Sequence, residues 1–228
     1  MEKTKVLIWD LPTRVFHWLL AASFLGAFVT AESERFRDVH VALGYTMLGL
    51  IGFRLLWGVI GTRYARFGSF AFGPRSVVRY VKSLFTRSPQ HHPGHNPAGS
   101  WAIYALLALA VVTGLTGYAA YNDIGGDWGE ELHEAIANAM LAVVFVHIAG
   151  VVVSSLIHRE NLARAMISGY KAGNPGDGIR YRHRLIAVLL VIATIGFWAG
   201  GADYLAAISG GGAQAATAQK HAGHDDRD

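Results

Sequence analysis

The stretch AIANAMLAVVFVHIAGVVVSSLI, residues 135–157, carries no charged residue, and His147 is its single ionisable side chain. A helix of this length crosses the roughly 30 Å of hydrocarbon in a bilayer, at about 1.5 Å per residue. Four further apolar runs lie at residues 15–31, 39–61, 100–121 and 185–202. Five such runs in 228 residues favour membrane spans over the long buried helices of a soluble protein.

The composition also indicates a lipid environment. Hydrophobic residues make up 52% of the chain and charged residues 16%, whereas soluble domains contain about 25% charged residues. Cysteine is absent, which excludes disulfides, thiolate zinc sites, iron–sulfur clusters and covalently attached haem c. Any metal or haem is therefore expected to have histidine, methionine or oxygen ligands. Residues 1–13 lack the apolar core of a signal peptide, so we expect the first apolar run to be retained.

The loop charges predict the orientation of the chain. Lys and Arg gather before the first run, between the second and third, and between the fourth and fifth, whereas the other two connections are mainly acidic. Basic loops stay on the cytoplasmic side. The sequence therefore predicts a multi-pass protein of the bacterial cytoplasmic membrane, with its N-terminus inside and its C-terminus in the periplasm. Residues 74–85 are predicted to form an amphipathic helix at the inner lipid surface.

Four histidines, His17, His40, His133 and His147, lie in or at the ends of these runs. Ionisable residues inside a span are costly and usually functional. His133 and His147 are fourteen residues apart, almost four helical turns, so they share one face and lie roughly 21 Å apart along the axis. Alternating helix directions pair His40 with His133 near the outer surface and His17 with His147 near the inner surface. Each pair of neutral imidazoles could complete a six-coordinate haem iron.

Other interpretations of these residues stay open at this point. A single histidine at a helix end is typical of an interfacial or capping residue, and the four together would also suit a non-haem metal transporter, although no Asp or Glu lies within a span. Arg54 and Arg14 could contact haem propionates or extend to the lipid headgroups. His95 is assigned a structural or propionate-adjacent role. Glycines within the spans permit close helix packing and also the approach of a flat macrocycle.

Several segments resemble the prokaryotic cytochrome b561 family, which includes the cytochrome b subunits of nickel–iron hydrogenases. They are WDLPTRVFHW at 9–18, HVALGY at 40–45, FRLLWG at 53–58 and GHNPAG at 94–99, followed by His133 and His147. The resemblance covers about residues 5–172. It implies two non-covalent b haems, with iron held by His17, His40, His133 and His147. It also implies electron exchange between quinone or quinol and a partner redox protein.

The expected fold is therefore an all-α transmembrane bundle. Residues 1–172 form a four-helix di-haem core, residues 173–208 a connection and a fifth transmembrane helix, and residues 209–228 a disordered tail rich in His and Asp. We expect a haem b electron carrier that serves the quinone pool and a periplasmic or membrane redox protein, such as a c-type cytochrome or a hydrogenase-like subunit. The alternatives are a stand-alone di-haem oxidoreductase, such as the superoxide oxidases among smaller relatives, and a permease. Membrane lipid is an expected partner and nucleic acid is not.

Overall fold

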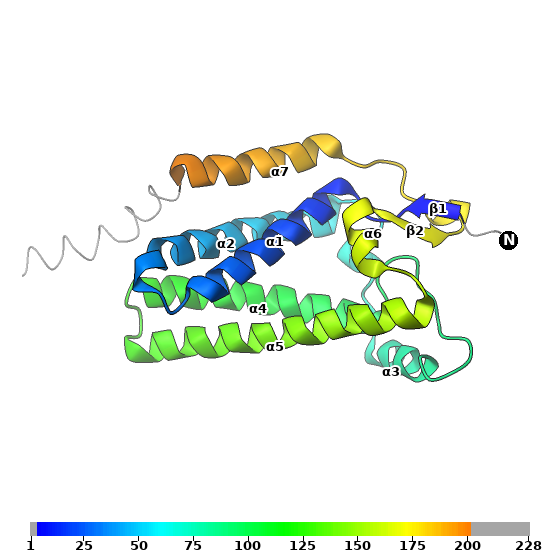
Figure 1. The fold of residues 1–228 in the computed structure, drawn as a ribbon, viewed down its shortest axis with the longest axis horizontal. Helices are drawn as coiled ribbons and strands as arrows, with labels where there is room; N and C mark the ends of the chain where they lie inside the picture. The colour runs from blue at the N-terminus through cyan, green and yellow to red at the C-terminus, as the bar shows by residue number, and fades with distance from the viewer. Residues whose placement is uncertain (1–3, 202–228) are drawn as a thin grey trace, which may run out of the picture.

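A computed structural model describes residues 4–201, and four long helices dominate it (Figure 1). They are α1 Leu11–Thr30, α2 Arg37–Ile60, α4 Pro97–Tyr121 and α5 Asp127–His158. Each is long and apolar enough to cross a membrane. α1 packs along α2, α4 packs along α5, and contacts between α2 and α4 join the two pairs. The mainly helical membrane bundle expected from the sequence is therefore present.

The helix starts follow local sequence signals. Asp10 caps α1, its carboxylate accepting a hydrogen bond from the backbone N–H of Thr13 at 2.8 Å, and Pro12 lies in the first turn. α1 therefore begins before the apolar run that starts at residue 15. Asn96 caps α4 in the same way, with Oδ1 2.7 Å from the backbone nitrogen of Gly99. α5 also begins early, at Asp127, where acidic residues in the first turn complement the helix dipole.

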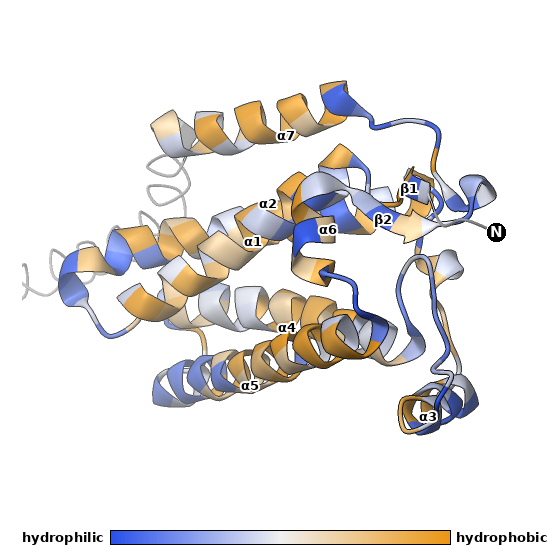
Figure 2. Ribbon diagram, turned by 45° about the vertical axis from the view of Figure 1, so that its right-hand side comes forward, coloured by the Kyte–Doolittle hydropathy of each residue, from blue (hydrophilic) through white to orange (hydrophobic). Residues whose placement is uncertain are grey.

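The bundle has a narrow buried core and a wide apolar exterior. Phe16, Met47, Leu50, Leu107 and Met140 pack together between the helices. Large apolar side chains on the outside are left uncovered, and Val29, Leu56 and Val59 are each about 70% exposed. Figure 2 shows apolar residues along the helices and hydrophilic residues gathered near their ends. This distribution suits helices whose backbone groups are satisfied internally and whose side chains face lipid.

A small sheet forms part of a cap at the end of the bundle where α1 begins (Figure 1). Strand β1, Thr4–Leu7, pairs antiparallel with β2, Tyr170–Gly173, with Thr4 opposite Gly173. The sequence did not predict this sheet, although the bundle that it caps is helical. Strands of four residues are too short for a period-two pattern to show, and the two partners are far apart in sequence. Apolar residues beneath the sheet, including Ile8, Trp9 and Tyr64, form a second buried cluster.

Short elements complete the cap. Helix α3, Pro74–Ser83, lies within the range predicted to be an amphipathic helix, and α6, Leu162–Ser168, follows α5. Within residues 4–201, two short 3-10 turns, Phe67–Ser69 and Pro175–Asp177, also lie at the capped end, and a third, Glu34–Phe36, joins α1 to α2 at the opposite end of the bundle.

The last described helix is α7, Arg184–Gly196, which continues as a π-helical turn at Phe197–Gly201. It packs beside α1, and the indole nitrogen of Trp198 donates to the hydroxyl of Thr46 on α2 at 3.0 Å. This apolar helix is shorter than the four candidate spans. A fifth span at 185–202 therefore stays a prediction. Its last residue and the tail at 209–228 lie outside the described residues.

Candidate functional site

Two of the four predicted histidines face each other at the end of the bundle remote from the sheet. His40 lies in the first turns of α2 and His133 lies on α5. Their ring centroids are 6.2 Å apart and the ring planes cross at 85°. Two imidazoles bound to one metal, each about 2 Å from it, have ring centres about 6 Å apart. The spacing of this pair therefore fits a shared metal between the rings.

The hydrogen bond of His40 fixes which ring nitrogen is available. Its Nδ1 lies 2.8 Å from the backbone carbonyl oxygen of Ala27 on α1. A carbonyl oxygen can only accept, so Nδ1 carries the proton and donates it. In the neutral ring the Nε2 lone pair is then left for a ligand, as in metal-binding histidines generally.

His133 is oriented in the same way by α4. Its Nδ1 lies 3.2 Å from the hydroxyl oxygen of Thr116. That hydroxyl is also 2.9 Å and 3.1 Å from the carbonyl oxygens of Val112 and Thr113, so its own proton points to the backbone and its oxygen accepts from His133. Gly117 permits this approach, because a Cβ there would lie 2.9 Å from Cε1 of His133. The Nε2 lone pair of His133 is thus also free.

The surroundings of this pair also suit a flat macrocycle. Gly44 lies one turn after His40 on the same helical face. A Cβ at Gly44 would meet no atom within 4 Å. Two imidazoles with available Nε2 atoms and open space beside Gly44 are the donor set and the room that a bis-histidine haem requires.

The other two predicted histidines lie toward the capped end of the bundle. His17 is on α1 and His147 is on α5, near enough to interact electrostatically. Nδ1 of His17 is buried and has no hydrogen-bond partner among the described residues. The His17 ring also contacts the ring of Trp18, with centroids 5.0 Å apart. Buried polar atoms nearly always have partners, so this nitrogen fits a site that holds a further group.

Arg54 lies inside the protein rather than extending to the headgroups. Its side chain is 3% exposed, and its guanidinium carbon lies 4.7 Å from the centre of the Phe67 ring. The Nη1 atom is buried without a hydrogen-bond partner in the described part of the chain. A buried cation with an unpaired donor suits an anionic partner such as a carboxylate. Asp10 interacts with it electrostatically, but that carboxylate is hydrogen-bonded to Thr13, Trp57 and Thr62.

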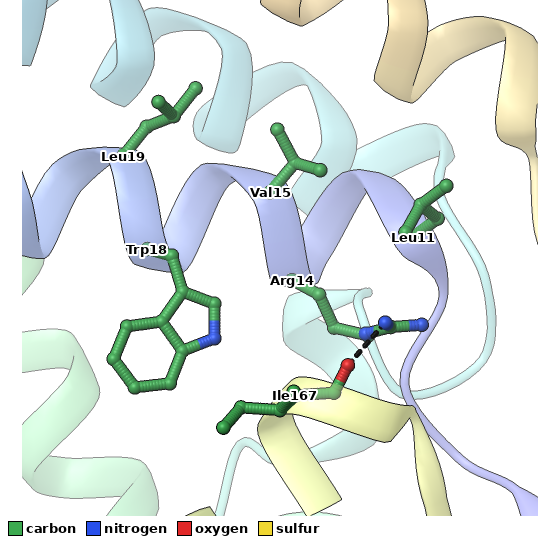
Figure 3. A pocket seen from close by; sticks show the side chains of 6 residues that line it. All are labelled: Leu11, Arg14, Val15, Trp18, Leu19 and Ile167. Atoms are coloured by element: carbon green, nitrogen blue, oxygen red, sulfur yellow. Dashed lines mark hydrogen bonds between the residues drawn. The ribbon is translucent and has the colours of Figure 1, made fainter.

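Arg14 lies near the start of α1, where it contacts α6. Its guanidinium donates to the backbone carbonyl of Ile167 and so ties α1 to α6 (Figure 3). Its Nε is buried and unpaired within the described residues. Arg14 therefore has a structural contact that the sequence did not indicate, and one donor remains available.

His95 lies near His147, and the sequence indicated its role only in part. Its ring lies between Trp9 and Phe70, with centroid distances of 4.6 Å and 4.3 Å. Burial lowers the pKa of His95 to about 3, and the positive charges of Arg54 and Lys171 act in the same direction. The ring is therefore neutral at pH 7, with Nδ1 buried and unpaired among the described atoms. The GHNPAG motif signalled this position, but the aromatic stacking depends on segments distant in sequence.

An apolar pocket of about 500 Å³ lies against the same end of α1. Figure 3 shows its lining, which is Leu11, Arg14, Val15, Trp18, Leu19 and Ile167. The indole nitrogen of Trp18 donates to the carbonyl oxygen of Met166 at 3.4 Å. Trp18 connects the pocket with the site because its ring also touches His17. The contribution of α6 could not be foreseen, because the sequence does not place that short helix beside α1.

His91 and His92, in the loop between α3 and α4, belong to a separate polar cluster in the cap. Glu160 lies 3.3 Å from Nζ of the buried Lys171 and 3.6 Å from Nε2 of His91. Burial would raise the pKa of Glu160, but the bond from His91, the charge of Lys171 and the N–H of Ala172 outweigh it and lower the pKa to about 2. The His92 ring packs against Tyr80. These contacts hold both rings within the cap, and Nδ1 of His92 is buried without a hydrogen-bond partner among the described residues.

Comparison with known proteins connects this geometry to a family. Residues 8–169 match the family model of prokaryotic cytochrome b561. The chain is 25% identical to a probable Ni/Fe-hydrogenase B-type cytochrome subunit of Azotobacter vinelandii, over 75% of this chain and 90% of that protein. It is 25% identical to the corresponding subunit of Rhodobacter capsulatus, over 75% of this chain and 82% of that protein. No solved structure matches the chain.

Proposed function

Because this chain belongs to the prokaryotic cytochrome b561 family, whose members transfer electrons through haem b, we propose that it holds two b haems and links the quinone pool to a partner redox protein. The observation that carries the two-haem proposal is the arrangement of His40 and His133. Their rings are 6.2 Å apart, and each Nδ1 is engaged by an oxygen of a neighbouring helix. A second histidine pair lies at the other end of the bundle.

His40 and His133 would hold one haem, and His17 and His147 the other. Haem b, when bound, supplies one-electron chemistry at a potential set by its axial ligands and surroundings. The protein's own residues fix the imidazole tautomers, as the bond from His40 to Ala27 does. His133 and His147 are fourteen residues apart on α5, roughly 21 Å along the helix, so they would hold the two haems toward opposite membrane surfaces.

Arg54 and His95 would surround the propionates of the haem held by His17 and His147. Each has a buried nitrogen that lacks a hydrogen-bond partner among residues 4–201. Arg54 also carries a fixed positive charge in a site that is 3% exposed. A propionate carboxylate can accept from both donors and would neutralise the charge. Arg14 offers one further unpaired donor, its Nε.

The pocket beside α1 would admit the quinone. Its walls are mainly apolar, and Trp18 at its edge touches the ring of His17. The exposed side chain of Ile167 opens the pocket toward lipid. Electron exchange would then take place at the haem held by His17 and His147.

The partner is proposed to be a hydrogenase-like subunit or a c-type cytochrome on the periplasmic side. Relatives that share about a quarter of their residues with this chain are named as B-type cytochrome subunits of Ni/Fe-hydrogenases. Asp123 in the connection after α4 and Asp127 in the first turn of α5 make this end acidic, and an acidic face suits a basic redox domain.

A haem count tests the central claim. The purified full chain should be red and contain two b haems by the pyridine haemochrome assay, with a six-coordinate reduced spectrum. His40→Ala and His17→Ala should each leave one haem, whereas His91→Ala, which alters a histidine paired with Glu160 in the cap, should keep both. A fully loaded wild-type protein with a single haem would contradict the proposal.

Filling the pocket tests the quinone site separately. Ile167→Trp should slow reduction of the haems by a water-soluble quinol by tenfold or more, because the larger ring occupies the pocket. Leu25→Trp adds the same ring to an exposed site on α1 away from the pocket, and should leave the rate unchanged. Both variants should retain two haems. Equal rates in the two variants would place quinone elsewhere without affecting the haem assignment.

A further inference from the structure

A second pocket, of about 600 Å³, lies where the chain enters α7. It is lined by five consecutive residues, Arg180, Tyr181, Arg182, His183 and Arg184. Within the described chain, none of these three arginines forms an ion pair with a carboxylate. Arg14 lies close enough to Arg182 to interact with it electrostatically, which adds a fourth positive charge nearby. The pocket therefore concentrates positive charge with no acidic residue in its lining.

The backbone of this segment is held in place by the rest of the protein. The carbonyl oxygen of Arg182 accepts from the N–H of Leu11 at 3.0 Å, and the Arg182 guanidinium donates to the hydroxyl of Tyr170. His183 has a left-handed φ of 51°, and its ring packs against Trp57 at 5.3 Å. A strained backbone persists only where its surroundings fix it. The arginines are thus presented by an ordered segment rather than by a free loop.

The start of α7 adds further donors. His183 occupies the N-cap position without a side-chain hydrogen bond to the first turn. The first backbone N–H groups of a helix have no partner within the helix, and they carry a partial positive charge. Helix starts with such groups bind phosphate readily. Here this feature coincides with three arginines and a pocket, which together point to an anion.

The side chains that follow are apolar and uncovered. Leu185, Val188, Leu189 and Ile192 are between 50% and 71% exposed along α7. Such a surface is expected to contact hydrocarbon rather than water. A ligand that fills the arginine pocket and also continues along this face must have an anionic head and apolar tails.

We propose that residues 180–184 bind the phosphate headgroup of an anionic phospholipid, whose acyl chains lie along α7. Basic pockets at the cytoplasmic ends of helices suit such headgroups, and this end of the bundle is the one predicted to be cytoplasmic. The exposed Tyr181 lies at the boundary between head and tails, where aromatic rings are favoured. The lipid would fix α7 against α1. This site is independent of the haem and quinone proposals.

Native mass spectrometry of the haem-loaded full chain tests the site. Wild-type protein titrated with phosphatidylglycerol should retain one lipid molecule more tightly than phosphatidylcholine with the same acyl chains. The double variant Arg180→Gln, Arg184→Gln should weaken phosphatidylglycerol binding about tenfold, because each basic residue near the surface contributes a several-fold effect. Arg182 is left intact since it also binds Tyr170. The control Arg75→Gln, Arg79→Gln removes the same charge from α3.

The outcomes separate lipid from other anions. Unchanged binding in the α3 variant, and no displacement by millimolar inorganic phosphate, would support a phospholipid site. Displacement by inorganic phosphate would show a simple anion site and overturn the lipid assignment. An equal loss in both variants, or equal binding of phosphatidylcholine, would show general attraction to the basic face and also overturn it. Two haems and an unchanged Tm in detergent confirm that each variant is folded, and Arg180→Gln alone provides a milder substitution.

Discussion

The rings of His40 and His133 face each other between α2 and α5, with centroids 6.2 Å apart. Each ring is held through Nδ1, His40 by the Ala27 carbonyl oxygen and His133 by the Thr116 hydroxyl oxygen. Contacts from α1 and α4 thus fix the two imidazoles on α2 and α5 so that both Nε2 lone pairs are free. The arrangement depends on no charged residue, which suits a site within the membrane.

We expect His40→Ala and His133→Ala to remove the same haem, and His17→Ala and His147→Ala to remove the other. The reason is that each haem requires both axial ligands of its pair, and the pairs lie toward opposite ends of the bundle. Redox titration of each variant, followed by visible absorbance, shows which of the two haem reduction steps is missing. Loss of the same haem reduction step in the His17 and His133 variants would contradict the pairing.

Thr116→Val should raise the midpoint potential of the haem held by His40 and His133. The Thr116 oxygen accepts from Nδ1 of His133 and makes the ligand more basic, which favours ferric iron. Losing one hydrogen bond of this kind is expected to shift the potential by about 20 to 40 mV.

Thr113→Val is the matched control for this change. Thr113 lies one turn earlier on α4, and its hydroxyl is 3.9 Å from the sulfur of Met140. Its replacement should leave both potentials unchanged. A fall in potential in the Thr116 variant would show that the hydroxyl donates to His133 instead of accepting.

Much of the bundle could be predicted from the sequence, because the spans contain almost no charge and their lengths match a bilayer. The helix ends were less predictable. α5 begins at Asp127 rather than at residue 135, because polar residues can continue a helix beyond the hydrocarbon. The β1–β2 sheet was missed, since each strand has four residues and its partner lies at the other end of the core domain.

The proximity of two of the candidate histidines could be predicted from the sequence. Alternating helix direction placed His40 with His133, and the structure brings these rings together. The supporting contacts were not predictable. Nothing in the sequence around Thr116 indicates that it contacts a histidine. Only the packing of α4 on α5 brings its hydroxyl oxygen to Nδ1 of His133. The burial of Arg54 beneath Phe67 likewise depends on a loop that returns over α2.

Arg54→Gln should lower the midpoint potential of the haem removed by His17→Ala. A fixed positive charge near a haem stabilises its reduced form, and an effect of order one kcal/mol, or about 40 mV, is expected for a buried charge. The exposed Arg63 provides the control, because Arg63→Gln removes the same charge from the surface. A shift confined to the haem removed by His40→Ala would contradict the position assigned to Arg54.

The acid stability of the cap should depend on Glu160. The pKa of Glu160 is lowered to about 2 in the folded protein, from an ordinary value of 4.5. A carboxylate with a depressed folded pKa stabilises the protein above its unfolded pKa, and this stabilisation is lost as the pH falls through the folded pKa. The Tm of the wild type should therefore fall between about pH 4.5 and pH 2.

The variant Glu160→Gln should have a lower Tm at pH 7 and a flatter dependence on pH in that range. The substitution removes the Glu160 carboxylate, which lies 3.3 Å from Nζ of Lys171, and so leaves that lysine buried without its ion-pair partner. Burial lowers the pKa of Lys171, and Glu160 opposes that shift. Glu131→Gln, at an exposed position on α5, should change neither quantity. An unchanged acid profile in Glu160→Gln would show that other carboxylates control it.

Asp10 is expected to be the most important polar residue for stability at the capped end of the bundle. Its carboxylate is 1% exposed and accepts from the N–H of Thr13 at 2.8 Å, from Nε1 of Trp57 at 3.1 Å and from the hydroxyl of Thr62 at 2.6 Å. These bonds join the start of α1 to the end of α2. The negative charge also interacts with Arg54.

Asp10→Ala should therefore lower the unfolding free energy by about 3 kcal/mol, since it removes an N-cap and leaves the buried indole N–H of Trp57 and the half-buried hydroxyl of Thr62 without their acceptor. For a chain of this size this corresponds to a fall in Tm of roughly 6 to 12 °C. Thr62→Ala and Trp57→Phe each remove one donor and should cost about 1 kcal/mol. Thermal unfolding of the haem-loaded protein, followed by Soret absorbance, measures all three. If Asp10→Ala cost no more than Thr62→Ala, the three bonds would not act together and the join between α1 and α2 would rest on apolar packing alone.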